Sequence, residues 1–148
     1  MFSNERQTIQ RFLETQSTLA LATIGADGHP QIAPLFYVSD EALNLYWLSS
    51  SASRHSLNLM AREKVAATIY PVAWHWTEIR GLQIEGVAYP VDDASTRQDM
   101  LNRYYQKFDL PPGFETIIAD SVLYALKPTW IRWLDNSVRF GYKSEIPF

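Results

Sequence analysis

Short apolar segments separated by turn residues follow one another along most of this sequence, and few helical patterns lie between them. The alternation predicts strands over 18–24, 31–38, 42–48, 64–70 and 79–91, then two or three more within 121–126, 129–134 and 138–142. A doubly wound parallel sheet needs a helix after nearly every strand, and this order does not provide one. The pattern therefore predicts a mainly β fold in which the strands form a small antiparallel barrel.

Helical spacing is confined to three places in the sequence. Apolar residues at positions 9, 12 and 13 indicate a helix over 4–15, and a shorter helix is expected after Ser53. Asp92 or Asp93 is expected to cap the third helix, which the turn residues at 109–113 end. The apolar face of this helix is predicted to consist of Met100, Leu101, Tyr104, Tyr105 and Phe108.

Prolines and glycines within the predicted strands indicate edges, bulges and strand ends. Pro34 has no N–H group to give to a neighbour, so it indicates an edge strand, a bulge, or a site where a ligand replaces a neighbouring strand. Gly81 and Gly86 indicate bulges or a close approach of two backbones. Pro128 and the turn that begins at Asp135 are expected to separate the last strands.

Composition limits the functions that such a fold can serve. A length of 148 residues fits one domain, 1–148, and 47% hydrophobic against 20% charged residues favour a folded chain. The 13 Lys and Arg against 16 Asp and Glu give a net charge of -3, which disfavours nucleic acid and anionic membranes as partners. There is no cysteine, no signal-peptide pattern and no apolar run of membrane-spanning length, so we expect a soluble cytoplasmic protein.

A hydroxyl-rich turn joins the third predicted strand to the short helix. Four serines between positions 49 and 53 offer hydroxyl donors, Arg54 offers a permanent forked cation, and the free N–H groups of the helix point toward the turn. His55 follows in the first helical turn, where it either donates to an anion or faces solvent. The segment predicts a phosphate site, and a simple serine-rich turn with a capped helix is the alternative.

Histidines and tryptophans are the other residue types with functional potential. His29, His55 and His75 lack the spacing of metal ligands, so no metal ion is expected. Trp74 and Trp76 lie in a proline-bounded connection with little core to fill, so one of them is a candidate to reach a cofactor or substrate across a subunit interface.

The order of these parts resembles the split-barrel flavin-binding family that includes pyridoxamine 5'-phosphate oxidase. Ser49 and the run Ser53-Arg54-His55 match the family's phosphate motif, although the family usually has a lysine at position 55. The segments 80–86 and 135–143 are similar to a small, functionally uncharacterised bacterial branch of the family. The resemblance covers nearly the whole chain.

The resemblance implies an antiparallel split β-barrel of the FMN-binding type, a homodimer with two equivalent sites, and an oxidoreductase that acts on an unknown small molecule. It implies that the segment 31–35 lies along the isoalloxazine ring and that Lys143 brings a cation to the cofactor. Gln83 either binds the polar edge of the ring or lies on a solvated face of its strand. The implied cofactor-binding residues are Ile32, Ala33, Pro34, Leu35, Ser49, Ser53, Arg54, His55, Gln83 and Lys143. The chain ends at Phe148 without the C-terminal substrate segment of pyridoxamine phosphate oxidase, so the vitamin B6 reaction itself is not expected.

Three other functions fit the same sequence. The fold can hold flavin, haem or a deazaflavin without turnover, and an enzyme of this fold can use a deazaflavin in place of FMN. A barrel that stacks single-stranded nucleic acid on its aromatic strands is the third, and the acidic net charge disfavours it.

Overall fold

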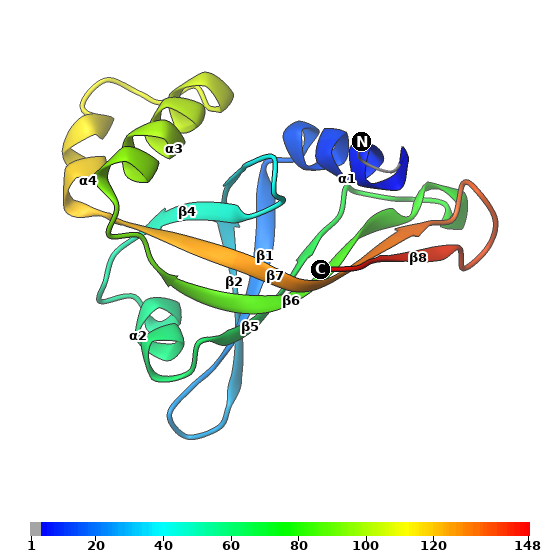
Figure 1. Ribbon diagram of the computed structural model, residues 1–148, viewed down its shortest axis with the longest axis horizontal. Coiled ribbons are helices and arrows are strands. Elements are labelled where there is room, and N and C mark those ends of the chain that lie inside the picture. Colours follow the sequence, from blue (N-terminus) through cyan, green and yellow to red (C-terminus); the bar gives the residue numbers. More distant parts are fainter. Residues whose placement is uncertain (1–3) are drawn as a thin grey trace.

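The computed structural model describes residues 4–148, in which one curled antiparallel sheet is flanked by helices (Figure 1). The strands are β1 (Thr18–Ile24), β2 (Pro30–Phe36), β3 (Val38–Ser39), β4 (Leu45–Ser49), β5 (Lys64–Ile69), β6 (Arg80–Pro90), β7 (Val122–Asp135) and β8 (Lys143–Ile146). Their order in the sheet is β2-β1-β5-β6-β7-β4-β3, with β8 paired to β7, and every pairing is antiparallel. This confirms the predicted mainly β, split-barrel fold.

Two of the helices begin at residues whose side chains cap them. They are α1 (Asn4–Thr15), α2 (Arg54–Ala61), α3 (Ala94–Lys107) and α4 (Phe114–Asp120), with a 3-10 turn η1 (Trp76–Glu78). Ser53 caps α2 by accepting from the Ser56 N–H, and Asp93 caps α3 by accepting from the Thr96 N–H at 2.9 Å. The cap predicted for the third helix is therefore confirmed at Asp93, and the helix predicted after Ser53 is capped by that serine. Within residues 4–148, no helix has the length and apolarity needed to cross a membrane.

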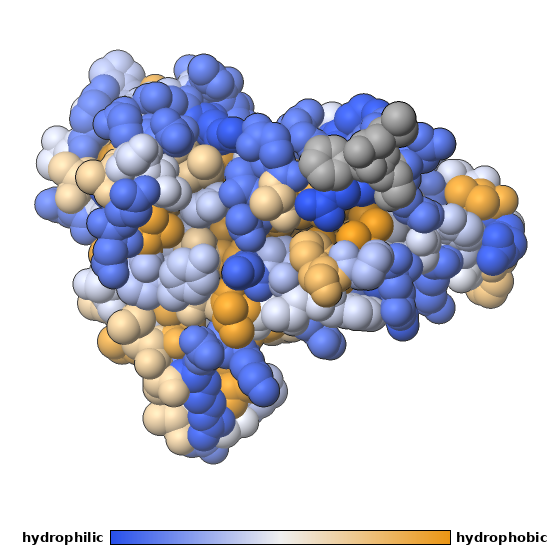
Figure 2. Space-filling view, viewed as in Figure 1, coloured by the Kyte–Doolittle hydropathy of each residue, from blue (hydrophilic) through white to orange (hydrophobic). Residues whose placement is uncertain are grey.

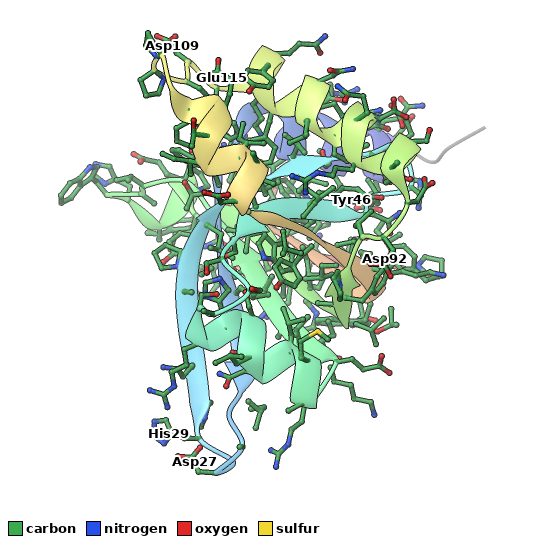
Figure 3. All side chains as sticks on the ribbon, turned by 90° about the vertical axis from the view of Figure 1, so that its left-hand side faces the viewer. Asp27, His29, Tyr46, Asp92, Asp109 and Glu115 are labelled. Carbon is green, nitrogen blue, oxygen red and sulfur yellow. The ribbon has the colours of Figure 1, made fainter. Side chains whose placement is uncertain are left out.

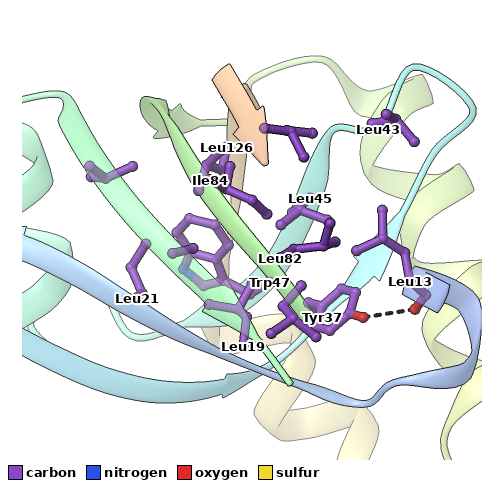
Figure 4. Close-up of a cluster of buried hydrophobic side chains, with 14 of the residues drawn as sticks. Leu13, Leu19, Leu21, Tyr37, Leu43, Leu45, Trp47, Leu82, Ile84 and Leu126 are labelled. Atoms are coloured by element: carbon purple, nitrogen blue, oxygen red, sulfur yellow. Dashed lines mark hydrogen bonds between the residues drawn. The ribbon is translucent and has the colours of Figure 1, made fainter. Parts of the chain in front are cut away.

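Large side chains on one face of the sheet form the core, and we call this face the inner face. Strand residues alternate between the inner face and the opposite, outer face, so every second residue of each central strand is buried. The Tyr37 hydroxyl donates to the Leu13 carbonyl at 2.7 Å and ties the end of α1 to the sheet (Figure 4). Residues of this core labelled in Figure 4 include Leu19, Leu21, Leu45, Trp47, Leu82 and Ile84.

Gly81 and Gly86 allow neighbouring backbones to approach β6 closely, as the sequence predicts. A side chain at Gly81 would collide with the carbonyl oxygen of Ile69 on β5, and one at Gly86 would collide with that of Lys127 on β7. The β6–β7 register shifts between Glu85 and Gly86, which marks a bulge.

Pro128 does not end a strand, contrary to the prediction from sequence. β7 runs without a break from Val122 to Asp135, because Pro128 pairs with Gly86 at the register shift between the two strands. A bulge interrupts the regular hydrogen-bond ladder, so a residue without an N–H group is tolerated there.

Other boundaries also differ from those predicted. β4 begins at Leu45, later than predicted, because Asp40 Oδ1 accepts from the Ala42 and Asn44 N–H groups in a turn where Leu43 has φ 67°. Strand pairing stops at Phe36 and resumes at Val38. The predicted strand at 138–142 is wrong: this segment is a loop, and β8 begins at Lys143.

The helical region after β6 also contains a helix that the sequence did not predict. α4 starts after Gly113, whose left-handed φ of 89° redirects the chain out of the turn. On α3, Met100 and Tyr104 are buried as expected, whereas Tyr105 is exposed, so the prediction for Tyr105 is wrong. The two helices lie together at one end of the sheet (Figure 1).

Candidate functional site

Small side chains hollow the outer face of the sheet. Ala20 and Ala22 of β1 and Ala66 of β5 lie on this face, between the buried residues of the same strands. They floor a groove of about 450 Å³, which we call the outer groove, and a second hollow of about 430 Å³ continues from it past Ala22 and Ala66. A groove of this size matches those that hold small organic ligands.

The edge strand β2 forms one wall of the outer groove. β2 is at one end of the sheet order, so the edge strand that Pro34 indicates is confirmed. Ile32 is 74% exposed and lines the groove, and Pro34 is exposed opposite Ala20. Ala33 and Leu35 alternate with them, and Leu35 packs against the core. Of the four β2 residues implied by the family resemblance, Ile32 and Pro34 are thus exposed on the outer face.

The opposite wall of the outer groove comes from β6 and β7. Gln83 lies on it as a cross-strand neighbour of Arg132, and Glu85 and Trp130, which pair across the same two strands, also line the groove. The guanidinium of Arg132 lies 4.9 Å from the Trp130 ring centre and forms an ion pair with Glu145 at 2.9 Å. The sequence did not predict Arg132 as a site residue. Its alternation with the buried Ile131 and Trp133 is the signal that could have placed it there.

Ser49, Ser53 and His55 converge at the start of α2, and we call them the serine–histidine cluster. His55 Nε2 lies 2.6 Å from Ser49 Oγ and 3.1 Å from Ser53 Oγ. The strand end at Ser49 and the helix cap at Ser53 fix both hydroxyls at the helix N-terminus. Burial lowers the pKa of His55, so its imidazole is mostly neutral at neutral pH. The Ser49 hydroxyl can donate to an acceptor at this place, and His55 Nε2 can donate when it carries a proton.

Arg54 lies beside the serine–histidine cluster and is not part of it. Its exposed side chain borders a hollow formed with Gly25, Asp27 and Asn58. Among the described residues, no hydrogen bond or ion pair joins Arg54 to Ser49, Ser53 or His55. A long, exposed guanidinium can reorient toward an anion without breaking any of these contacts.

Lys143 lies away from the outer groove. It is an exposed residue at the start of β8, where it pairs with Leu134, and it does not line either hollow of the outer face. The structure therefore brings Ile32 and Gln83 together in one place and Ser49, Ser53 and His55 in another, and it places Lys143 with neither group.

The serine–histidine cluster and the outer groove belong to opposite faces of the sheet. Asn58 of α2 donates to Thr23 Oγ1 and to Gln31 Oε1, each at 3.1 Å. Thr23 is buried in alternation with the outer-face residue Ala22, so α2 packs on the inner side of β1 and β2. The helix that carries the cluster therefore packs on the side of these strands away from the outer groove.

Aromatic residues gather at the end of a projecting arm made by β6, β7 and β8. Trp76 contacts Phe140 edge to face at 5.6 Å, and Asn136 donates to the Trp76 carbonyl at 2.9 Å. Trp74 is 87% exposed. Apolar surface is visible at this end of the molecule (Figure 2). Trp74 and Trp76 thus lie outside the core, as the sequence indicates.

The remaining histidines lie apart from the serine–histidine cluster in the fold. His29 is exposed at the tip of the β1–β2 hairpin beside Asp27 (Figure 3), and His75 is exposed next to η1. Across residues 4–148, no three His, Asp or Glu side chains are grouped so that they could hold a metal ion.

The fold and the site together define a split-barrel protein with a candidate phosphate site at α2 and a ligand-sized groove on the outer face. Residues 6–135 match the model of the pyridoxamine 5'-phosphate oxidase family. The chain belongs to this family.

Two curated relatives show how far the likeness extends along the sequence. A UPF0306 protein of Photorhabdus laumondii is 26% identical over 138 residues, which cover 93% of this chain and 92% of that protein. A pyridoxine/pyridoxamine 5'-phosphate oxidase of Cupriavidus metallidurans is 26% identical over 91 residues, which cover 61% of this chain and only 41% of the oxidase. The match to this oxidase is therefore partial.

Solved structures share the fold at lower identity. Campylobacter jejuni ChuZ superposes with a TM-score of 0.82 at 19% identity, over 99% of this chain and 61% of ChuZ. The conserved hypothetical protein Rv2991 of Mycobacterium tuberculosis gives 0.78 at 19% identity, over 97% and 92% of the two chains. HutZ of Vibrio cholerae, described as a haem storage protein, gives 0.67 at 24% identity, over 82% and 88%.

Proposed function

We propose that this protein binds FMN non-covalently between two copies of the chain and acts as an oxidoreductase on a small organic molecule. The observation that carries the proposal is the convergence of Ser49, Ser53 and His55 at the N-terminus of α2, in a chain that belongs to the pyridoxamine 5'-phosphate oxidase family. Hydroxyl and imidazole donors at a helix N-terminus favour a phosphate by hydrogen bonding and by the helix dipole.

The outer groove suits the flat ring system of a flavin. Its alanine floor lets a planar ring approach the sheet, and the edge strand β2 has backbone groups that no neighbouring strand covers. Gln83 can donate to or accept from the polar edge of the ring. Arg132 adds positive charge to the same wall, where Glu145 partly balances it.

A homodimer would allow one FMN molecule to contact both the serine–histidine cluster and the outer groove. The serine–histidine cluster of one chain and the outer groove of the same chain lie on opposite faces of β1 and β2. A second copy packed on the outer face would bring its own cluster toward the groove of the first, which produces two equivalent sites. A symmetric dimer is also the commonest oligomer among soluble proteins.

When bound, FMN supplies hydride and electron transfer. The residues of this chain then bind and orient it: the cluster and Arg54 hold the phosphate, and Ile32, Pro34 and the alanine floor exclude water from one face of the ring. No nucleophile, base and acid triad is needed for this role.

Arg54→Ala tests the phosphate end of the site. A charge-assisted hydrogen bond contributes about 1.5–3 kcal/mol, so we expect the substitution to weaken FMN affinity by about tenfold to a hundredfold. The affinity is measured by fluorescence titration of the apoprotein, with riboflavin, which has no phosphate, as the matched ligand. Equal loss for both ligands, or no loss for FMN, would contradict a phosphate role for Arg54.

Haem is the second candidate ligand, because HutZ, described as a haem storage protein, shares the fold. The residues that line the two outer hollows include no His, Met, Cys or Tyr, which are the usual axial ligands of haem iron. This lining favours a flavin. Titration of the apoprotein with hemin separates the two, because haem bound by an axial side chain shifts the Soret band. We expect no such shift, and a shifted Soret band would favour haem over FMN.

A further inference from the structure

We propose that His55 takes up a proton when a phosphate group binds at the serine–histidine cluster, so that this chain holds FMN in a pH-dependent way. The inference rests on the proposed function, because it gives a titrating role to one residue of the proposed phosphate site. It concerns His55 alone and does not depend on what the bound flavin then reduces or oxidises.

The hydrogen bonds of the cluster limit where its protons can lie. Ser53 has one hydroxyl proton, and its Oγ is 2.9 Å from the Ser50 carbonyl oxygen and 2.6 Å from Ser56 Oγ. The carbonyl oxygen can only accept. Ser49 Oγ is 2.6 Å from His55 Nε2 and is free to donate its proton to that nitrogen. A neutral imidazole with a bare Nε2 therefore fits the cluster as it stands.

A bound phosphate changes this distribution of protons. The phosphate oxygens only accept hydrogen bonds, so the Ser49 hydroxyl must turn its proton away from His55 in order to bind them. A bare Nε2 would then face the lone pairs of Ser49 Oγ across the same 2.6 Å. Nε2 must therefore carry a proton in the complex, either as the neutral Nε2–H tautomer or as the imidazolium. The imidazolium also places a positive charge beside the anion, which the neutral tautomer does not. The charge of the phosphate thus favours proton uptake at His55 over a shift of tautomer.

The surroundings of His55 supply no other reason to hold that proton. Burial lowers the pKa of His55 in the free protein. The charged groups beside α2 are Arg54 in the same turn, a cation, and Asp27 of the β1–β2 hairpin, which borders the hollow at Arg54 and Asn58. The side chains that bond to Asn58 of α2 from β1 and β2 are the uncharged Thr23 and Gln31. Within residues 4–148, no carboxylate forms an ion pair with His55. An arriving anion is therefore the group that stabilises the imidazolium.

The sign of the pH dependence follows from this coupling. Binding raises the pKa of His55, so the affinity for phosphate is highest below the pKa of the free protein and falls as pH rises toward the pKa of the complex. A phosphate monoester has its second pKa near about 6, so its charge is nearly constant above about pH 7. We expect FMN affinity to fall about tenfold or more between about pH 6.5 and 8.5.

The test is a fluorescence titration of wild-type apoprotein with FMN across this pH range, with riboflavin in parallel. His55→Lys is the matched variant, because it places at position 55 a cation whose charge is constant over the range. We expect its FMN affinity to change less than about threefold across the range. Riboflavin affinity is expected to be flat for both proteins, since it has no phosphate.

Calorimetry in buffers of different ionisation enthalpy supplies a second measurement that does not depend on activity. Wild-type protein is expected to take up a fraction of one proton per FMN near about pH 7.5, and His55→Lys none. FMN binding with pH-independent affinity and no proton uptake would overturn this inference while leaving the proposed function intact. Failure of the wild-type protein to bind FMN at any pH would instead overturn the proposed function, and the inference with it.

Discussion

Replacing Ala66 by tryptophan is expected to weaken FMN binding by about a hundredfold or more. Ala66 lies at the junction of the two outer hollows, because it lines both of them. Its side chain points away from the core, between the buried Val65 and Ala67. An indole at this position would occupy the floor on which we place the flavin ring, without displacing any core residue.

The controls for Ala66→Trp separate occupancy of the groove from loss of the fold. Ala66→Ser keeps the small volume and is expected to bind FMN within about threefold of wild type. The thermal unfolding midpoint of Ala66→Trp is expected to stay close to that of wild type, because the outer face has room for the ring. Full FMN affinity in a folded Ala66→Trp protein would show that the ring lies elsewhere.

Trp47→Ala is expected to destabilise the protein by about 3–5 kcal/mol, the usual cost of truncating a buried aromatic side chain. Trp47 on β4 is 0% exposed and stacks near Tyr124 of β7, with ring centres 6.2 Å apart. A loss of this size is a large part of the total stability of a typical domain, about 5–15 kcal/mol. Urea unfolding monitored by circular dichroism measures it.

Trp74→Ala is the matched control, because Trp74 is 87% exposed and its removal leaves no cavity. We expect a change in unfolding free energy within about 0.5 kcal/mol. Trp47→Phe provides an intermediate case. The Trp47 Nε1–H is buried and has no hydrogen-bond partner among residues 4–148, so phenylalanine fills much of the volume and removes an unsatisfied donor. Equal effects of Trp47→Ala and Trp74→Ala would contradict the core as described.

The strands and helices that the sequence predicted well are those with local signals. The spacing of apolar residues and the cap at Ser53 placed α1, β1 and α2, because side-chain alternation and capping act over a few residues. Pro128 was misread as a break, since the bulge that accommodates it depends on Gly86, far away in the sequence. The Asp40 turn delayed β4 through side-chain contacts that strand propensity does not include.

One part of the candidate site also has local signals in the sequence, and the other part does not. Ser49, Ser53 and His55 are close in sequence, so their convergence follows from a strand, a turn and a helix cap that the sequence indicates. The outer groove does not follow from local pattern, because alanines occur on both faces: Ala66 is part of the groove, and Ala67 is part of the core. Arg132 was missed because only the pairing of β6 with β7 brings it beside Gln83.

The central claim is that two copies of the chain bind FMN together. It is tested most directly by sedimentation of protein that has been incubated with FMN and dialysed, with detection at the visible absorbance of the flavin. The account predicts that this absorbance sediments with the mass of two chains, at about one flavin per chain. Flavin that dialyses away completely, or that sediments with the mass of a single chain, would contradict an FMN site built by two copies of this protein.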